Sequence, residues 1–392
     1  MQTGTKTRII PYGRQHITQE DIEAVTTVLQ SDFLTQGPAI AAFEKQFADY
    51  VGSTYAVALA NGTAALHLCA MALNVKPGTR VITTPITFAA SANCVRYCGG
   101  DVFFADIDPT TFLLDINSVR ALLESKPKGY FQGIIPVDFA GSAVNLEAFR
   151  KLADEFNCWL IEDACHAPGG FFKDASQKQQ KCGNGNFAEL SIFSFHPVKH
   201  IATGEGGMIT TNDKKLYDKL LLLRTHGITK DSSKFKNPTT DLEIGPWYYE
   251  QQELGYNYRL TDFQAALGSS QLQRADKNLE RRKQLAKQYD LAFKNTAVHT
   301  PLAAVGHAYH LYVIQVEKRA TLYEYLKEKN IFAQVHYVPL HLMPYYKTFG
   351  YKKGDFPNAE AYYSSCLSIP MYHSLSDEDQ AFVINTILEF NM

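Results

Sequence analysis

A lysine followed by small, flexible residues has the clearest potential for chemistry in this sequence. Lys199 lies in the stretch Ser194-Phe-His-Pro-Val-Lys-His-Ile-Ala-Thr-Gly-Glu-Gly-Gly207, just after an apolar run. Burial lowers the pKa of a lysine, and the neutral amine can then attack a carbonyl carbon. The glycines allow the backbone to approach a flat or bulky group closely. Because most lysines are solvated surface residues, Lys199 indicates a Schiff-base site only together with suitable partners.

A carboxylate at the end of another apolar run is the first such partner. Asp163 follows Leu160-Ile-Glu, and the end of a buried strand is where a side chain faces a ligand in an α/β protein. Pyridoxal phosphate (PLP) needs a carboxylate at its pyridine nitrogen, because the protonated ring then withdraws electrons from the bound substrate. An aspartate at this position can also simply cap the following turn.

A turn between an expected strand and an expected helix is the second partner. The first backbone N–H groups of a helix bind phosphate, and the helix dipole adds to the attraction. Asn61-Gly62-Thr63 offers such a turn, with Thr63 and Ser194 as hydroxyl donors, although similar turns often serve as plain helix caps. Phe88 follows the next expected strand and could stack on a pyridine ring, while a place in the core is more common for phenylalanine.

These residues follow short apolar runs that alternate with helix-period segments. Such alternation predicts an α/β fold with a mainly parallel sheet covered on both faces, whose ligands bind beyond the carboxyl ends of the strands. Helices are expected from Thr18 to Leu29, from Ala64, from about Ala89, and at 145–156 and 213–225. The expected strands are 55–59, 80–84, 102–105, 133–137, 159–162, 190–193 and 207–211.

A long helical pattern from Thr261 to Lys294 leads into the C-terminal third of the chain. We therefore predict a large domain at residues 1–262 and a smaller α+β domain at 263–392. The smaller domain is expected to hold strands at 310–316 and 332–336 and helices at 319–329 and 377–390. The polar stretches Asp174 to Gly185 and Asp231 to Trp247 are predicted to be surface loops.

Composition excludes several classes of function. The formal net charge of the 392 residues is −2, from 38 basic and 40 acidic residues, so no basic excess exists to bind a nucleic acid. The seven cysteines are scattered without a CxxC pair and are expected to be reduced thiols. No apolar run has the length of a signal peptide or a membrane span. These patterns predict a cytoplasmic protein that has no membrane partner.

Taken as a set, the motifs along the chain resemble one enzyme family. NGTAALH, TPITFAASANCV, IEDACHAPGG, SFHPVKHIATGEGGMI, GYNYRLTDFQAALGSSQL and QVHYVPLH are similar to the motifs of the DegT/DnrJ/EryC1/StrS sugar aminotransferases, which are PLP-dependent transferases of fold type I. The resemblance covers the chain from Pro11 to beyond Pro370. It implies a large domain with a mainly parallel seven-stranded sheet, a smaller C-terminal domain, and PLP as cofactor with pyridoxamine phosphate as its intermediate form.

The resemblance also implies a role for each matched residue at the cofactor. Lys199 would carry PLP as a Schiff base and then move the proton, and Asp163 would pair with the pyridine nitrogen. Relatives often have glutamine where this chain has histidine at position 166. The other residues expected around the cofactor are Gly62, Thr63 and Ser194 at the phosphate, and Phe88 and His166 at the ring.

A homodimer with shared active sites is a further implication, because Asn257 matches the residue that reaches the cofactor phosphate of a neighbouring subunit.

Within the family, the chain resembles the pseudaminic acid branch. The motifs that carry this resemblance are IPYGRQHIT, SDFLTQGP, LRTHGIT, PWYYEQQELGYNYRLTD and AQVHYVPLH. That branch implies transfer of the amino group of L-glutamate to the C4 ketone of a UDP-4-keto-6-deoxy-N-acetylhexosamine. The residues expected to contact this sugar nucleotide are Tyr12, Asp32, Phe33, Leu34, Thr35, His336, Tyr337, Val338 and Pro339.

Several alternatives remain beside this interpretation. An aminotransferase for another keto sugar, such as a dTDP-linked 3- or 4-keto hexose, differs only in its acceptor. Sugar dehydratases of the family replace the lysine with histidine, so Lys199 favours transamination, and a non-catalytic PLP sensor would not need the Lys199 and Asp163 pair. The string Gly183-Asn-Gly-Asn-Phe-Ala188 lacks the preceding strand of a nicotinamide site. His336, His341 and His373 fit no zinc spacing, so no metal is expected.

Overall fold

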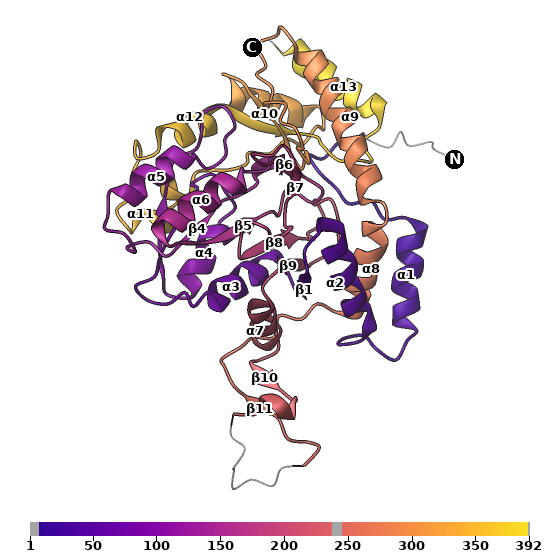
Figure 1. The fold of residues 1–392 in the computed structure, drawn as a ribbon. Coiled ribbons are helices and arrows are strands. Elements are labelled where there is room, and N and C mark those ends of the chain that lie inside the picture. Colours follow the sequence, from indigo (N-terminus) through magenta and orange to yellow (C-terminus); the bar gives the residue numbers. More distant parts are fainter. Residues whose placement is uncertain (1–7, 237–244, 391–392) are drawn as a thin grey trace.

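A seven-stranded sheet forms the centre of the protein (Figure 1). The computed structural model describes residues 8–236 and 245–390. Each predicted strand of the sheet is present within one or two residues of its expected bounds. The strands, in spatial order, are β1 (Tyr55–Leu59), β9 (Gly207–Thr211), β8 (Leu190–Ser194), β5 (Trp159–Asp163), β4 (Gly133–Ile135), β2 (Arg80–Thr83) and β3 (Asp101–Phe104).

The sheet is mainly parallel, as predicted. β3, β2, β4, β5 and β8 run parallel to one another, while β9 pairs antiparallel with both β8 and β1. The carboxyl ends of β1, β2, β5 and β8 therefore lie at one edge of the sheet. Asp163 ends β5, Gly62 begins the helix after β1, and Phe88 and Lys199 lie in the loops after β2 and β8, so the topology brings all four to the same edge.

Helices cover both faces of the sheet. On one face, buried side chains of α3 (Gly62–Ala72), α4 (Ala90–Tyr97) and α7 (Lys214–Arg224) pack on the strands. Capping side chains fix several helix starts, as Asn61 does for α3 by accepting from the Ala64 N–H. The opposite face is covered by α2 (Pro38–Val51), α5 (Ile116–Glu124), α6 (Leu146–Phe156) and α8 (Asp262–Leu272), with α1 (Gln19–Leu29) packed against α8.

The long helix expected from Thr261 to Lys294 is broken in the structure. α8 ends at Leu272, and α9 (Ala275–Phe293) begins after a short break. At the break the Arg274 guanidinium turns to the buried Asp21 carboxylate of α1, which also accepts from Ser270 and Gln271. No glycine or proline marks the position, so a tertiary ion pair accompanies the break rather than a local signal in the sequence.

The C-terminal part of the chain has a second core. Strands β12 (Tyr312–Gln315) and β13 (Cys366–Ile369) pair antiparallel, and their apolar side chains pack with α9, α10 (Arg319–Glu328) and α13 (Asp377–Glu389). The strand predicted at 332–336 is wrong, because only Gln334 pairs there, with Ser368, before the chain turns toward the sheet. The remaining elements of this part are η3 (Leu340–Leu342), α11 (Pro344–Lys347) and α12 (Pro357–Ser365).

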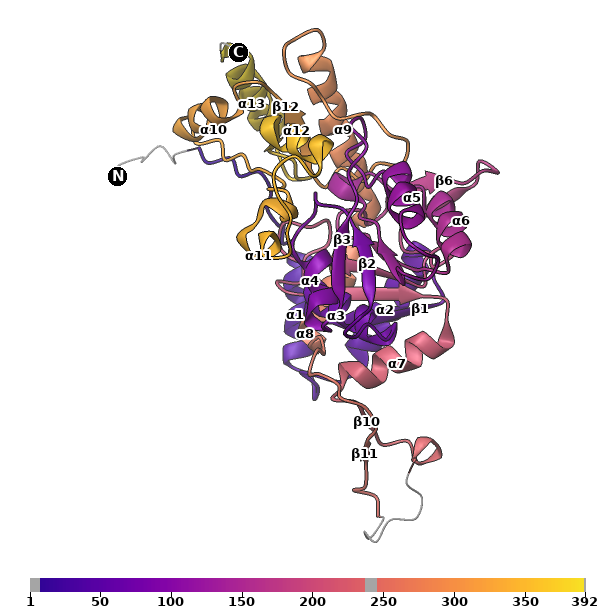
Figure 2. The same ribbon diagram turned by 90° about the vertical axis from the view of Figure 1, so that its left-hand side faces the viewer.

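Two predicted loops have more structure than expected. The stretch Asp174 to Gly185 includes β7 (Gln179–Lys181), which pairs with β6 (Phe171–Lys173) as a hairpin around an Asp174 turn. The stretch Asp231 to Trp247 begins with η2 (Ser232–Lys234) but falls partly outside the described residues. Its described part belongs to an arm that projects beyond α7, where β10 (Ile228–Thr229) pairs with β11 (Glu250–Gln251) (Figures 1 and 2).

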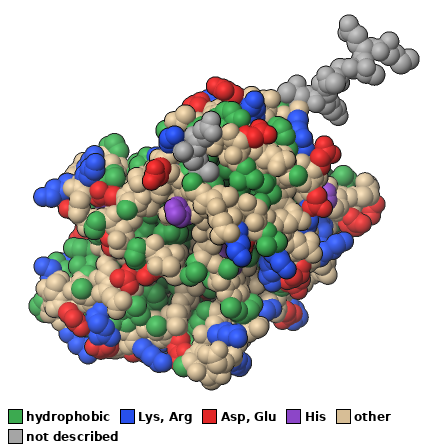
Figure 3. Space-filling model, turned by 90° about the horizontal axis from the view of Figure 1, so that it is seen from above, with side chains coloured by type: hydrophobic (Ala, Val, Ile, Leu, Met, Phe, Trp, Pro, Cys, Tyr) green, Lys and Arg blue, Asp and Glu red, His purple; other side chains and the backbone are tan. Residues whose placement is uncertain are grey.

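The surface agrees with the balanced composition. Seen from above, basic and acidic side chains are interspersed over the face, without one large patch of a single sign (Figure 3). Among the residues that the structure describes, no helix combines the length and the apolar character needed to cross a bilayer. The division at residues 262 and 263 stays a prediction, and α8 and α9 both contribute buried side chains to the core that they share with α2.

Candidate active site

A cavity of about 960 Å³ opens at the carboxyl edge of the sheet. Its floor consists of the loops after β1, β2, β5 and β8, and its roof is the segment 334–343. The roof is tied to the floor where the Leu340 N–H donates to the Pro85 carbonyl at 2.9 Å. The predicted residues that line this cavity are Tyr12, Gly62, Thr63, Phe88, Asp163, His166, Ser194, Lys199, His336, Tyr337 and Val338.

Lys199 enters the cavity from the loop that follows β8. Its Nζ lies 3.3 Å from Nε2 of His310. Loss of hydration in the cavity lowers the pKa of the Lys199 amine, and the nearby Cys165 and Asp163 oppose this shift only in part. A larger fraction of the amine is therefore neutral than for a surface lysine, and a neutral amine is the form that attacks a carbonyl carbon or accepts a proton.

Asp163 is the last residue of β5 and is 4 % exposed. Its Oδ2 accepts from the Ser91 hydroxyl at 2.6 Å, and its Oδ1 accepts from the Cys165 N–H at 3.2 Å. The Ser91 hydroxyl is itself 2.7 Å from the Thr87 hydroxyl, so Ser91 in the first turn of α4, supported by Thr87 in the loop after β2, fixes the carboxylate. A carboxylate held in this way is a ready acceptor for one more N–H group from a ligand in the cavity.

The first turn of α3 has the geometry of an anion site. Gly62 and Thr63 begin the helix, and both line the cavity beside Ser194. A Cβ at position 62 would lie only 3.0 Å from Ser194 Cβ, so glycine is what permits this close approach. The first N–H groups of a helix have no partner within the helix, and they attract negative charge.

His166 is buried, and one hydrogen bond defines its protonation state. Its Nδ1 accepts from the Ala140 N–H at 3.2 Å, so the ring proton belongs on Nε2. Nε2 lies 3.3 Å from the Tyr337 hydroxyl of the roof. Burial, with the positive charge of Lys199 next in importance, lowers the pKa of His166 well below its usual value. His166 therefore presents a neutral ring to the cavity.

Aromatic side chains surround the mouth of the cavity. Phe88 is 62 % exposed, and its ring centroid lies 6.3 Å from that of Tyr337. Tyr12 packs on His336 with a centroid distance of 5.3 Å. Burial lowers the pKa of His336 to about 3, and its Nδ1 lies 2.8 Å from the Ser368 hydroxyl. The mouth is therefore a largely uncharged aromatic surface that suits a ring-shaped ligand.

Some predicted residues lie outside this cavity. Asn257 is exposed at the foot of the arm, and its backbone pairs with that of Thr225. The segment from Asp32 to Thr35 is exposed beyond α1, while Pro339 begins the short η3 turn in the roof. None of these residues lines the cavity of its own chain, so their roles stay predictions.

Two residues of the site were not predicted from the sequence. Ser91 was part of a quoted motif, and only the fold brings its hydroxyl to Asp163. His310 precedes β12 and comes from the C-terminal part of the chain. No spacing signal links it to Lys199, because the two lie 111 positions apart. The only signal in the sequence was that His310 is a polar residue next to an apolar strand.

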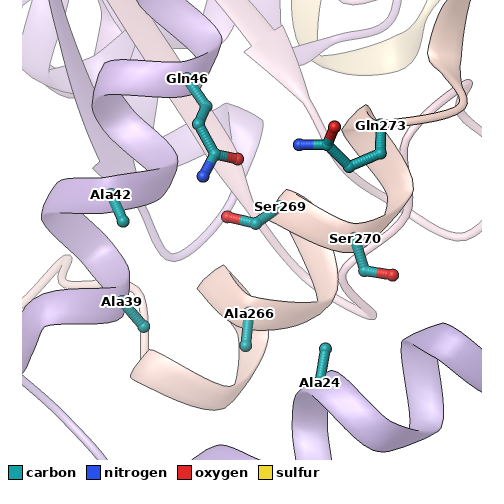
Figure 4. A pocket seen from close by; sticks show the side chains of 8 residues that line it. All are labelled: Ala24, Ala39, Ala42, Gln46, Ala266, Ser269, Ser270 and Gln273. Atoms are coloured by element: carbon teal, nitrogen blue, oxygen red, sulfur yellow. The ribbon is translucent and has the colours of Figure 1, made fainter.

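Two other features in the described part of the chain, a buried acidic cluster and a hollow between helices, are weaker candidates for a functional site. Asp138, Glu162 and Cys182 could together approach a metal ion, but the group is sealed within the protein and both carboxyl groups have raised pKa values. A hollow of about 340 Å³ between α1, α2 and α8 has no titratable group in its lining (Figure 4). It is lined by Ala24, Ala39, Ala42, Gln46, Ala266, Ser269, Ser270 and Gln273.

The main cavity fits PLP on three separate counts. An amine of lowered pKa, a hydrogen-bonded carboxylate and a glycine-permitted helix start all border the same space. These are the groups that an aldehyde, a pyridinium N–H and a phosphate require, respectively. The neutral His166 and the aromatic mouth are suited to contact a flat ring between them.

Relatives of known sequence share nearly the whole chain. The Bacillus subtilis spore coat polysaccharide biosynthesis protein SpsC is 38 % identical over 393 residues, which cover 97 % of each chain. A UDP-4-amino-4,6-dideoxy-N-acetyl-beta-L-altrosamine transaminase of Campylobacter jejuni is 36 % identical, over 97 % of this chain and 96 % of its own. Similarity of this extent includes every element that borders the cavity.

Solved structures agree with the sequence relationship. PseC of Helicobacter pylori, an aminotransferase of pseudaminic acid biosynthesis, superposes with a TM-score of 0.86 at 30 % identity, covering 97 % of this chain and 99 % of its own. Spr1654 of Streptococcus pneumoniae, in a PLP-form, gives 0.85 at 29 % identity, covering 97 % of both chains. The profile of one family matches residues 15–388. The chain belongs to the DegT/DnrJ/EryC1/StrS aminotransferase family, and it is a PLP-dependent sugar aminotransferase.

Proposed function

We propose that the enzyme transfers the amino group of L-glutamate to the C4 ketone of UDP-2-acetamido-2,6-dideoxy-β-L-arabino-hex-4-ulose, a UDP-4-keto-6-deoxy-N-acetylhexosamine. The product is the 4-amino sugar, which would feed pseudaminic acid biosynthesis. The observation that carries the transamination is the placement of Lys199 and Asp163 on one cavity. The choice of acceptor is supported by the transaminase from Campylobacter jejuni and by PseC, both of which align along nearly all of this chain.

The residues of the floor would hold the cofactor. When bound, PLP supplies an electron sink for the charge that remains after a proton leaves the amino donor. Asp163 would accept the N–H of the pyridine nitrogen, with Ser91 keeping the carboxylate oriented. Gly62, Thr63 and Ser194 would hold the phosphate at the start of α3. Phe88 and His166 would contact the two faces of the ring.

Lys199 would first bond to the cofactor and then act as the base. Its Nζ takes the proton from Cα of glutamate, a task that requires the neutral amine which burial favours. With the keto sugar bound, the same Nζ works in the opposite direction and delivers a proton to sugar C4. Water is kept from the reacting atoms by Phe88 and by Tyr337 of the roof. Two successive half-reactions on one enzyme predict ping-pong kinetics.

The sugar nucleotide would enter through the aromatic mouth. Tyr12, His336, Tyr337 and Val338 line it, so the hexose ring would lie beneath the roof with C4 turned toward Lys199. Lys199 is the only lysine or arginine among the described residues that line the cavity. The negative charges of the diphosphate must therefore be met outside this lining, by solvent or by residues beyond it.

A second copy of the chain would complete the site. The arm that carries β10 and β11 stands away from the body, and its described part exposes Trp247 and Tyr249 at 66 % and 54 % (Figure 2). Exposed aromatic residues of this kind commonly mark an interface. Asn257, at the foot of the arm, would reach the cofactor phosphate of the partner. We therefore propose a homodimer with two shared active sites.

Mixing two inactive variants tests this assembly. Lys199→Arg and Asn257→Ala subunits, refolded or co-expressed together, can form hybrid dimers in which one site has both native residues. We expect up to about a quarter of wild-type activity to return, since half of the subunits form hybrids with one intact site of two. Each variant alone should remain inactive, and a mixture that is no more active than its components would contradict shared sites.

Another nucleotide-linked keto sugar is the alternative acceptor. SpsC, named for spore coat polysaccharide biosynthesis, is as similar in sequence as the altrosamine transaminases are. A dTDP-linked 3- or 4-keto-6-deoxyhexose would undergo the same chemistry at Lys199. The two proposals differ only in what the mouth and the surrounding residues recognise.

A visible-spectrum titration tests both the chemistry and the acceptor. The purified enzyme should have the yellow absorption of lysine-bound PLP, which L-glutamate should bleach and the UDP-4-keto sugar should restore. Restoration by a dTDP-keto sugar alone would select the alternative acceptor. A Lys199→Arg variant should lose at least about a thousandfold in turnover, because arginine cannot serve as the base. Retained turnover in that variant would contradict the assignment of Lys199.

A further inference from the structure

The partner of the Lys199 amine comes from the other end of the chain. His310 lies just before β12, is 4 % exposed, and places Nε2 at 3.3 Å from Lys199 Nζ. It lines the main cavity together with Lys199, so the contact lies beside the reacting groups rather than behind them. No role described above uses His310.

The surroundings of His310 keep its ring neutral. Its ring centroid lies 4.3 Å from that of His166 and 5.8 Å from that of His200. Burial lowers its pKa well below the usual value, and the positive charges of Lys199 and Arg282 lower it further. A neutral imidazole has one nitrogen with a free lone pair. The ammonium form of Lys199 has no lone pair and can only donate, so Nε2 accepts from it; the ring proton then lies on Nδ1, which has no partner among the described residues.

Arg282 holds the backbone that carries the His310 ring. Its Nη1 donates to the carbonyls of Tyr309 at 3.0 Å, His310 at 3.3 Å and Met371 at 2.9 Å. Arg282 is 1 % exposed, and no carboxylate within the described residues forms an ion pair with it. Its uncompensated charge opposes protonation of the neighbouring histidine, while its hydrogen bonds hold the backbone that carries the ring.

We infer that His310 is the positioning residue that holds the Lys199 amine whenever it is released from the cofactor. The lone pair on Nε2 orients the amine for proton removal and stabilises the ammonium form until Lys199 delivers the proton. The charge balance is simple, because His310 accepts a hydrogen bond and takes up no proton itself. This inference rests on the proposed function, in which Lys199 is the base.

The first test measures the amine in the protein without cofactor. The pH dependence of Lys199 acetylation by acetic anhydride, followed by peptide mass spectrometry, reports the pKa of the amine. His310→Leu removes the acceptor that stabilises the ammonium, so its midpoint should fall by about one pH unit. His310→Gln keeps an acceptor oxygen near the position of Nε2 and should stay close to wild type. An unchanged or raised midpoint in His310→Leu would overturn the inference.

The second test measures proton transfer with the cofactor bound. In single-turnover experiments with L-glutamate, His310→Leu should slow bleaching about 10- to 100-fold while the KM for glutamate changes little. The isotope effect with α-deuterated glutamate should increase, because proton removal becomes slower than the other steps. His310→Gln should recover most of the rate. Equal losses in both variants, without a change in isotope effect, would overturn the inference.

A third variant guards against poor folding. His310→Ala with added imidazole supplies the missing ring from solution, and a rate that rises with imidazole supports the inference, whereas no rise contradicts it. Failure of the proposed function is separately visible. If the cofactor absorption of Lys199→Arg still bleaches and recovers as in wild type, Lys199 is not the base and the proposed function fails. If Lys199→Arg loses turnover but the His310 variants behave like wild type, only the positioning role of His310 is rejected.

Discussion

Two neighbouring carboxylates on β5 have opposite environments. Asp163 faces the cavity, where hydroxyl and N–H groups satisfy both of its oxygens. Glu162 points to the other side of the strand, as alternate residues do, and lies against Asp138 and Cys182. Its Oε2 accepts from the Gly183 N–H at 2.9 Å, and its carboxyl group lies within hydrogen-bonding reach of Asp138.

The difference shows that burial alone does not identify a functional acid. Burial raises the pKa of both Asp138 and Glu162, and their mutual repulsion adds to the shift in Asp138. Two buried carboxyl groups in contact share a proton more readily than they both ionise. Asp138 also accepts from the Val144 N–H, which holds the loop after β4 in a fixed turn. The hidden pair is structural, whereas Asp163 has the access and the donors that a ligand requires.

Replacing Asp163 should produce the largest effect in this comparison. Asp163→Asn removes the charge that would keep the pyridine nitrogen protonated, so turnover should fall about a thousandfold or more. The measurement is the steady-state rate with L-glutamate and the keto sugar at saturating PLP. Glu162→Gln is the matched control one position away, and its turnover should stay within about threefold of wild type. Similar losses in the two variants would remove the distinction between the two sides of β5.

Removing the donor to Asp163 should have an intermediate effect. Ser91→Ala deletes the 2.6 Å hydrogen bond to Oδ2 without changing the backbone. A hydrogen bond to a charged group contributes about 1.5–3 kcal/mol, so the affinity for PLP should fall roughly 10- to 100-fold. Cofactor titration followed by absorbance measures this change. Ser191→Ala, on the hidden side of the sheet, should leave the affinity for PLP as it is in the wild type.

The smallest effect concerns stability rather than activity. The raised pKa values of Asp138 and Glu162 mean that the folded protein holds a proton which the unfolded chain releases. This contribution is complete below the unfolded pKa, about 4, and is lost as the pH rises through the folded pKa. Glu162→Gln replaces the shared proton with an amide N–H. Its unfolding midpoint should therefore fall less between pH 5 and pH 9 than that of wild type, by roughly a few degrees.

Thermal unfolding followed by circular dichroism at several pH values measures how the unfolding midpoint changes with pH. Glu147→Gln on α6 is a suitable control because hydrogen bonds to Lys151 and the Ala175 N–H lower the pKa of Glu147, so its carboxylate stays ionised throughout this pH range. The control should unfold with the same pH dependence as wild type. Parallel slopes for wild type and Glu162→Gln would mean that the hidden pair carries no shared proton.

Local patterns were sufficient to predict the sheet and its ligand edge. Apolar runs bounded by turns identified all seven strands, and Asp163 was found because it ends such a run, Lys199 because it follows one. The break after Leu272 and the missing strand at 332–336 could not be foreseen. The break accompanies the ion pair between Arg274 and Asp21 of α1. The stretch 332–336 forms no strand because only Gln334 pairs with a residue of β13, Ser368. Both depend on contacts between segments far apart in the sequence.

The same limit applies to the site. Ser91 and His310 meet their partners across 72 and 111 positions, and no spacing rule connects residues at such separations. Gly62 was expected for its backbone N–H, yet the structure adds that a side chain there would press on Ser194. Residue types therefore indicated the chemistry, while the residues that orient the reacting groups required the fold.

The separate origins of the cavity's floor and roof have an evolutionary consequence. The floor comes from the loops between positions 61 and 207, whereas the roof is one short segment, 334–343, anchored at Pro85 and flanked by the Tyr346 hydroxyl on Asn93. Lineages can exchange or mutate this short stretch without disturbing the machinery beneath it. If the roof contacts the acceptor as we propose, acceptor preference can diversify by changes in about ten consecutive codons, and chimaeras that transplant the segment would be the natural starting point for redirecting the enzyme to new sugars.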